Sequence, residues 1–156
     1  MGKRGPAPEP THLKIIKGNP GHRPLNEKEP KPCPIFKLPP APKWMDKYAK
    51  AEWRRMGKIL MRIGVLTEAD LGSFTNYCCT YARWRHAEEN VIAHFKEEGT
   101  YLVGSGFRKQ RHPELITIEK ALGQMLQFAQ QFGMTPSART SIKVDRPIDD
   151  KDFFGD

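Results

Sequence analysis

The sequence has few cysteines and no long apolar run. Its three cysteines, Cys33, Cys78 and Cys79, form neither an even set nor a Cys-x-x-Cys motif, so we expect reduced thiols rather than a disulfide framework. No stretch approaches the roughly 20 apolar residues that a membrane helix requires, and the basic, proline-rich N-terminal stretch has no apolar signal core. These features predict a soluble protein that is not exported and does not associate with a membrane.

Signatures of catalysis are also missing. The chain contains no Gly-x-x-x-x-Gly-Lys-Ser/Thr phosphate loop, and its five histidines do not pair with cysteines at the spacing of metal ligands. A terminal group of acids, Asp149, Asp150 and Asp152, lies outside any expected helix and lacks the fixed geometry that metal catalysis requires. The sequence therefore predicts neither an enzyme nor a bound cofactor or metal.

Positive charge is what the chain has in excess. Lys and Arg total 26 against 18 Asp and Glu, a net charge of +8, which favours a polyanionic partner such as DNA. Residues 1–43 hold most of the excess and 11 of the 14 prolines, a composition typical of an extended arm. The length fits one domain, so we expect a basic arm over residues 1–43, a helical domain over residues 44–143 and an acidic tail over residues 144–156.

The first helix is predicted from about Asp46 to Ile63, before Gly64. Its apolar residues recur at the spacing of one helical face, which includes Trp53 and Leu60. The nearly opposite face carries a stripe of cations. The residues of this basic stripe are Lys47, Lys50, Arg54, Lys58 and Arg62.

A second, longer helix is predicted to begin after a Thr67 N-cap and to continue to about Glu98, before Gly99. Its apolar arc is wider than one packing partner needs. We expect another subunit to cover the part of this apolar surface that the partner helix leaves exposed. The aromatic residues predicted for that interface are Tyr77, Tyr81 and Trp84.

The third helix is predicted to start at Pro113, after a short extended piece or loop and a basic run. Apolar residues at 3-4 spacing predict that it packs lengthwise against the second helix as an antiparallel hairpin. Those residues are Leu115, Ile118, Leu122, Met125, Ala129 and Phe132. A short helix is expected after Thr135. The predicted fold class is all-α, with no confident strand.

Three groups of cations are candidates for contact with DNA phosphates. They are Lys14, Lys17 and Arg23 in the arm, Lys47, Lys50, Arg54 and Lys58 in the basic stripe, and Arg108, Lys109 and Arg111 before the third helix. A helix-turn-helix is disfavoured, because the second helix begins with Glu68 and Asp70 and no nearby cation. For the whole protein, a nucleoid-type or regulatory DNA-binding protein and an RNA-binding module remain alternatives. For the separate segments, the arm could be a solvated basic linker, and the basic stripe could be an ordinary solvent-exposed helix face.

A set of motifs in fixed order points to a known family. The arm contains Gly18-Asn19-Pro20-Gly21-His22-Arg23-Pro24-Leu25-Asn26, and later landmarks are Trp53, Gly64-Val65-Leu66-Thr67, Tyr77-Cys78, His112-Pro113 and Met134-Thr135-Pro136-Ser137-Ala138-Arg139. The chain resembles the small terminase subunits of tailed phages, in the branch that carries this arm signature.

The resemblance implies a helical homo-oligomeric ring that binds double-stranded phage DNA in the host cytoplasm. Such a ring hands the DNA to the large terminase subunit, which carries the ATPase and the nuclease. The acidic tail would then contact the large subunit, although a merely solubilising tail is the alternative. The residues predicted for that contact are Asp149, Asp150, Asp152, Phe153 and Phe154.

Overall fold

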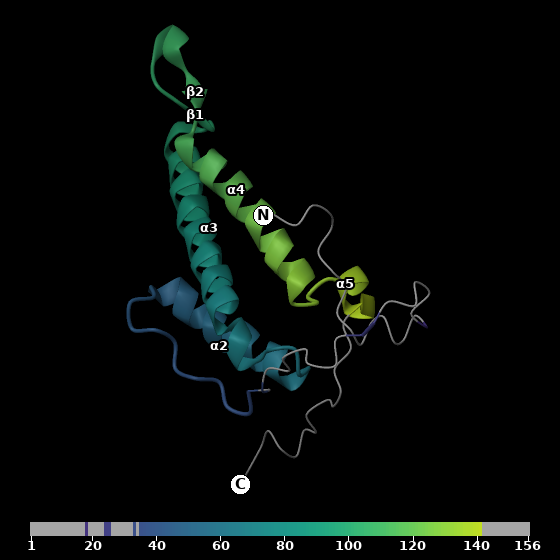
Figure 1. Cartoon of the computed structure of the whole chain (residues 1–156). Coiled ribbons are helices and arrows are strands. Elements are labelled where there is room, and N and C mark those ends of the chain that lie inside the picture. The colour runs from purple at the N-terminus through teal and green to yellow at the C-terminus, as the bar shows by residue number, and fades with distance from the viewer. Residues whose placement is uncertain (1–17, 19–23, 26–32, 34, 142–156) are drawn as a thin grey trace, which may run out of the picture. The chain divides into compact units, whose positions relative to one another are not determined.

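Four helices organise the folded part of the chain. The computed structural model describes residues 18, 24, 25, 33 and 35–141, and two compact units are distinguished, Met1–Pro32 and Cys33–Asp156. All elements below belong to the second unit: α2 (Lys47–Arg62), α3 (Leu71–Glu98), α4 (Pro113–Gln131) and the short α5 (Pro136–Ser141) (Figure 1). The all-α prediction is confirmed, while most of the arm signature and the acidic tail lie outside the described residues.

The start of α2 is fixed by a side-chain cap. The carboxylate of Asp46 accepts a hydrogen bond from the backbone N–H of Ala49 at 2.7 Å, which satisfies one of the free donors of the first turn. The same carboxylate lies 2.6 Å from Nε2 of His86 on α3. Burial alone would raise the pKa of Asp46, but the Ala49 N–H and His86 hold it below its ordinary value of 3.8.

Replacing Asp46 should therefore cost stability in a pH-dependent way. We expect Asp46→Ala to lower the free energy of unfolding by about 1 kcal/mol at neutral pH, because the cap is lost. Asp46→Asn keeps the capping oxygen and should cost less. Since the folded pKa lies below 3.8, the contribution of the carboxylate is present above that pH and is lost as the pH falls through the folded value. Urea unfolding at several pH values tests this, and an Asp46→Ala cost that persists unchanged in acid would contradict it.

The turn between α2 and α3 is closed by a second cap. The backbone N–H and the hydroxyl of Thr67 both donate to the carboxylate of Asp70, at 3.1 and 2.6 Å, and the turn Glu68–Asp70 leads directly into α3. At its other end α3 stops at Gly99, whose positive φ of 66° is favoured by glycine. The predicted end of this helix at Glu98 is thus confirmed, whereas its α-helical part begins at Leu71, three residues later than the sequence predicts.

Helices α3 and α4 form the expected antiparallel hairpin. Ring pairs fix the register: Phe74 lies 6.2 Å from Phe132, and His94 lies 5.0 Å from His112. The rotation of α4 differs from the prediction in one respect. Leu122, predicted to pack against α3, is 46% exposed, while Ala121 is only 3% exposed.

The main core joins α2, the first turns of α3, the end of α4 and the segment before α2. Ile35 and Met45 from that segment are buried in the same cluster as Trp53 and Phe74. The backbone N–H of Ile35 donates to the carbonyl of Leu66. Residues that precede α2 thus contribute to this core.

A buried carboxylate links α2 to α3 within this core. Glu52 is 2% exposed, and its oxygens accept hydrogen bonds from the Tyr77 hydroxyl at 2.7 Å and from the Arg55 guanidinium at 2.7 and 2.8 Å. Burial, and next the hydrogen bond to Glu52, raise the pKa of Tyr77. Since the carboxylate is both paired and hydrogen-bonded, its burial is tolerated.

The far end of the hairpin carries a small β-ribbon that the sequence did not predict. Strands β1 (Leu102–Val103) and β2 (Gln110–Arg111) pair antiparallel between α3 and α4 (Figure 1). Gly104 makes the turn possible, because its φ is +107° and a Cβ there would lie 2.6 Å from the carbonyl oxygen of Arg108.

Candidate nucleic-acid interface

The basic stripe follows the exposed face of α2. Lys47, Arg54, Lys58 and Arg62 are exposed and Lys50 is half-buried, while Trp53, Met56 and Leu60 on the other face are buried. Two of the cations are tied to backbone: Lys50 Nζ donates to the carbonyl of Lys43 at 3.0 Å, and Arg54 Nε donates to the carbonyl of Lys50 at 3.2 Å. These bonds hold part of the stripe along the helix.

The exposed face of α2 carries charge of one sign. Glu52 is the only acid between Lys47 and Arg62, and it faces the core, where it pairs with Arg55 and Tyr77. Glu52 is only 2% exposed, so it adds no negative charge to this face. A solvated helix face normally mixes charges of both signs, so this face favours binding of an anionic polymer.

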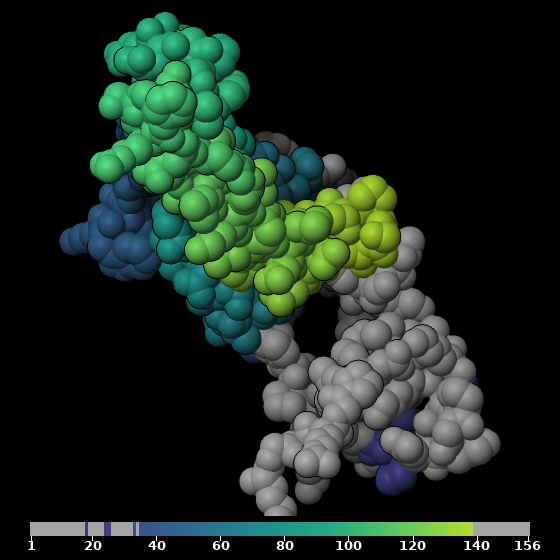
Figure 2. Space-filling model, turned by 90° about the horizontal axis from the view of Figure 1, so that it is seen from above, coloured from purple at the N-terminus to yellow at the C-terminus, as the bar shows by residue number. Residues whose placement is uncertain are grey.

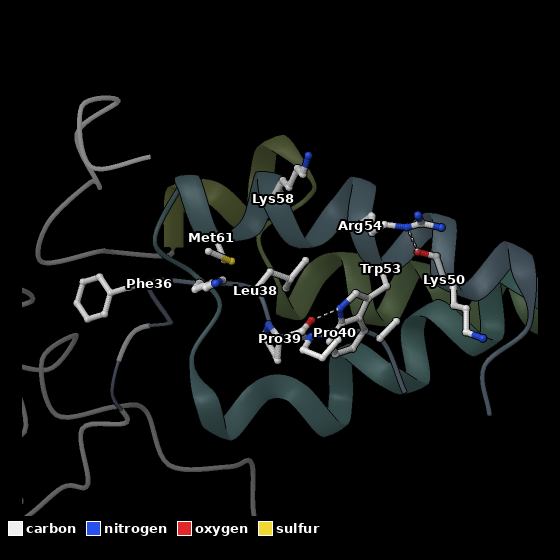
Figure 3. Close-up of a pocket in the computed structure, with 11 residues that line it drawn as sticks. Phe36, Leu38, Pro39, Pro40, Lys50, Trp53, Arg54, Lys58 and Met61 are labelled. Carbon is white, nitrogen blue, oxygen red and sulfur yellow. Dashed lines mark hydrogen bonds between the residues drawn. The ribbon is translucent and has the colours of Figure 1, made fainter. Parts of the chain in front are cut away.

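A groove lies between α2 and the segment that precedes it. Its volume is about 610 Å³. Figure 3 shows Lys50, Arg54 and Lys58 on α2, with Leu38, Pro39 and Pro40 beside Trp53. The Trp53 indole N–H donates to the carbonyl of Pro39 at 2.9 Å. Gly57 allows Leu38 to approach, since a Cβ at residue 57 would lie 2.7 Å from both Leu38 methyl carbons.

A second cationic region is the β-ribbon. Arg108 and Lys109 are exposed, and Arg111 pairs with Glu119 on α4. Phe107 at the tip is fully exposed, and it was not among the residues singled out from the sequence. A large apolar residue beside the basic run is the signal that would have identified it.

The structure places two of the three predicted cation groups apart from each other. The ribbon lies at the far end of the α3–α4 hairpin, whereas α2 packs beside its other half (Figure 1). Lys14, Lys17 and Arg23 of the arm lie outside the described residues. Within the described part, the α2 stripe and the ribbon are therefore separate candidate contacts.

The three aromatic residues predicted at a subunit interface have different surroundings. Tyr77 is 6% exposed and bonded to Glu52, which leaves little of it for another subunit. Tyr81 and Trp84 are half-buried with ring centroids 5.5 Å apart, so part of each is accessible. Exposed leucines on α4 add to this surface: Leu122 at 46% and Leu126 at 54%.

Those leucines and Trp84 fall on the same side of the hairpin. Trp84 on α3 and Leu115 on α4 both border the buried cluster of Ala87, Val91 and Ile118. Leu122 and Leu126 follow Leu115 by seven and eleven residues and continue its side of α4. Figure 2 shows one face of α4 uncovered by other described elements between the ribbon and α5. We call Trp84, Leu115, Leu122 and Leu126 the apolar strip.

The described residues give little support to a catalytic thiol, a metal site or a membrane helix. Burial raises the pKa of Cys78 and also that of Cys79, which disfavours a thiolate nucleophile at either. Over residues 35–141 and the few described before them, no three His, Cys, Asp or Glu side chains are grouped to hold a metal. No helix in that part is long and apolar enough to cross a membrane.

Comparison with known proteins gives one match. The sequence profile of a family described as phage terminase, small subunit, matches residues 49–147, which is more than half of the chain and includes most of α2, the hairpin and α5. The arm signature and the residues from Asp149 onward lie outside the match. No curated protein and no solved structure matches.

Proposed function

Because this chain belongs to the phage terminase small-subunit family, whose members have a role in DNA packaging, we propose that it binds duplex phage DNA and recruits the large terminase subunit. Small subunits of this family are generally not catalytic. Packaging takes place in the infected host cell, and we place this chain in the host cytoplasm. The ATPase and nuclease activities belong, in this proposal, to the large subunit.

The observation that carries the proposed DNA binding is the single-signed face of α2. Each phosphate neutralised by Lys or Arg releases condensed counterions, so affinity for DNA falls steeply with salt and depends little on sequence. A row of cations at 3-4 spacing on a helix whose one acid, Glu52, is buried fits this kind of contact. The exposed cations of the ribbon offer a second contact, and the arm cations a third.

The test is to neutralise the cations in separate groups and to measure DNA binding against salt. We expect Arg54→Gln with Lys58→Gln to weaken binding roughly tenfold or more at low salt, about 1.4 kcal/mol. The slope of log affinity against log salt should fall by about 0.9 for each lost phosphate contact. The next two groups to be neutralised are those of the ribbon, Arg108, Lys109 and Arg111, and of the arm, Lys14, Lys17 and Arg23.

A matched pair controls for net charge. Lys96 and Lys120 are exposed cations of α3 and α4 outside the three groups, so Lys96→Gln with Lys120→Gln removes the same charge and should change affinity little. Fluorescence anisotropy with duplexes of unrelated sequence measures both pairs. If neutralising each of the three groups leaves binding as tight as in the parent protein at low salt, the proposed DNA contacts are wrong.

The proposed contact with the large subunit rests on the acidic tail. Asp149, Asp150 and Asp152 would complement a basic surface, and Phe153 and Phe154 would anchor the segment. Deleting residues 149–156 should weaken association with the large subunit and any stimulation of its ATPase, while the native mass stays unchanged. Unchanged association would assign recruitment to the helical domain.

A homo-oligomeric ring is the third part of the proposal. The predicted interface of Tyr77, Tyr81 and Trp84 is supported by the partial exposure of Tyr81 and Trp84. The leucines of the apolar strip extend it along α4. Contiguous apolar surface of this kind marks protein interfaces in soluble proteins.

A further inference from the structure

The groove beside α2 combines an apolar floor with a cationic rim. Trp53, Leu38 and Met61 contribute apolar surface, while Lys50, Arg54 and Lys58 follow one another at four-residue spacing along one side. Lys37 adds a fourth cation, and none of the described residues that line the groove is acidic. At about 610 Å³ it is in the size range of pockets that hold a ligand of several groups.

The lining specifies the chemistry of an occupant. Carboxylates placed opposite Lys and Arg form charge-assisted hydrogen bonds. Aromatic side chains gain the most free energy from burial when the apolar floor that receives them includes another aromatic ring, here the indole. The best match is thus a short segment that carries several carboxylates beside one or two aromatic side chains. A nucleic acid would satisfy the rim but would leave the floor of Trp53, Leu38 and Met61 without an apolar partner.

One segment of the chain itself has this composition. Residues 1–32 carry seven Lys or Arg against three Glu, so like charge disfavours them at a cationic rim. Residues 149–154 read Asp-Asp-Lys-Asp-Phe-Phe, with three carboxylates directly before two phenylalanines. We propose that residues 149–154 dock within the same chain into the groove, with Phe153 and Phe154 on its floor and the carboxylates at its rim.

The residues that lead into the tail pack against the core that borders the groove. Phe132 at the end of α4 lies 6.2 Å from Phe74, whose ring lies 4.8 Å from that of Trp53 at the groove. Met134, two residues further along, packs against the same core. From Ser141, the last residue of α5, twelve residues lead to Phe153 and span up to about 40 Å when extended.

The docked tail would cover cations that the proposed function assigns to DNA. This consequence, unlike the docking itself, rests on the proposed function. Lys50, Arg54 and Lys58 belong both to the groove and to the basic stripe, so tail and phosphates compete for them. The large subunit, by binding the same segment, would uncover the stripe.

The test uses a labelled peptide of residues 145–156 and the protein that lacks residues 149–156. We expect the peptide to bind the truncated protein and to bind the full chain at least about tenfold more weakly, because the chain's own tail occupies the groove. A peptide with Phe153→Ala and Phe154→Ala keeps every charge and should lose most of its affinity. Anisotropy in the absence of DNA measures each case.

Two protein variants locate the site. Arg54→Glu removes a cation of the groove, whereas Arg62→Glu makes the same change on the same stripe outside the groove. Only Arg54→Glu should weaken peptide binding by about tenfold or more, with circular dichroism confirming that both variants remain helical. Equal weakening by both, equal binding to full and truncated protein, or no binding at all would overturn the proposal. The peptide assay contains no DNA, so its outcome does not depend on the proposed function. If the parent protein failed to bind DNA in a separate assay, that result would count against the proposed function alone.

Discussion

Replacing Phe74 with alanine should lower the free energy of unfolding by about 3–5 kcal/mol. Phe74 is completely buried, and its ring contacts aromatic rings on each side: Trp53 of α2 at 4.8 Å, Tyr77 of α3 at 6.2 Å and Phe132 after α4 at 6.2 Å. Its removal leaves a cavity at the point where α2, α3 and the end of α4 meet. A loss of this size is a large part of the stability of a small domain.

The same change further along α3 provides the control. Phe95 is 41% exposed and stacks on Tyr101, with ring centroids 4.5 Å apart, so Phe95→Ala should cost about 1 kcal/mol. Chemical denaturation of both variants, with the protein concentration held constant, measures the difference. Equal costs for the two changes would mean that the core does not centre on Phe74.

Local signals in the sequence predict the helix ends well. Asp46 and Thr67 are side-chain caps, and Gly99 is a glycine stop, so each boundary depends on a few neighbouring residues. The periodicity of α2 likewise predicts its buried face, because its apolar residues occupy one narrow side. These features could be predicted because they require no knowledge of a distant partner.

Features that depend on distant partners could not be predicted. Apolar residues lie around much of α4, so spacing alone did not decide which side faces α3, and Leu122 was assigned to the core in place of Ala121. The burial of Glu52 depends on Tyr77, 25 residues away. The groove requires the segment at Leu38 to return to α2, and strands of two residues are too short for a periodic pattern.

Placing charge on the apolar strip should dissociate the proposed oligomer. In the double variant Leu122→Glu with Leu126→Glu, two carboxylates take the place of leucines that are half-exposed in the single chain. Burying a leucine is worth about 1.5–3 kcal/mol, and a buried carboxylate without a partner adds a further cost. We therefore expect native mass, measured by light scattering, to fall toward that of the monomer.

The fold of the chain should survive this change. Neither leucine belongs to the buried clusters of the single chain, and glutamate is a good helix former. Circular dichroism should therefore remain helical. Trp84→Glu, on the facing part of α3, should lower the mass in the same way, although some loss of stability is expected because Trp84 also packs against Ala87 and Val91.

A control with the same added charge comes from the other side of α4. Gln124 and Gln127 are exposed and lie away from the leucines on the helical wheel, so Gln124→Glu with Gln127→Glu should leave the mass unchanged. If both double variants keep the parent mass, the apolar strip is not the interface. If both dissociate, net charge rather than apolar contact governs assembly. Dissociation of the leucine variant alone, with helicity retained, is the result that assigns this side of the hairpin to contact between subunits.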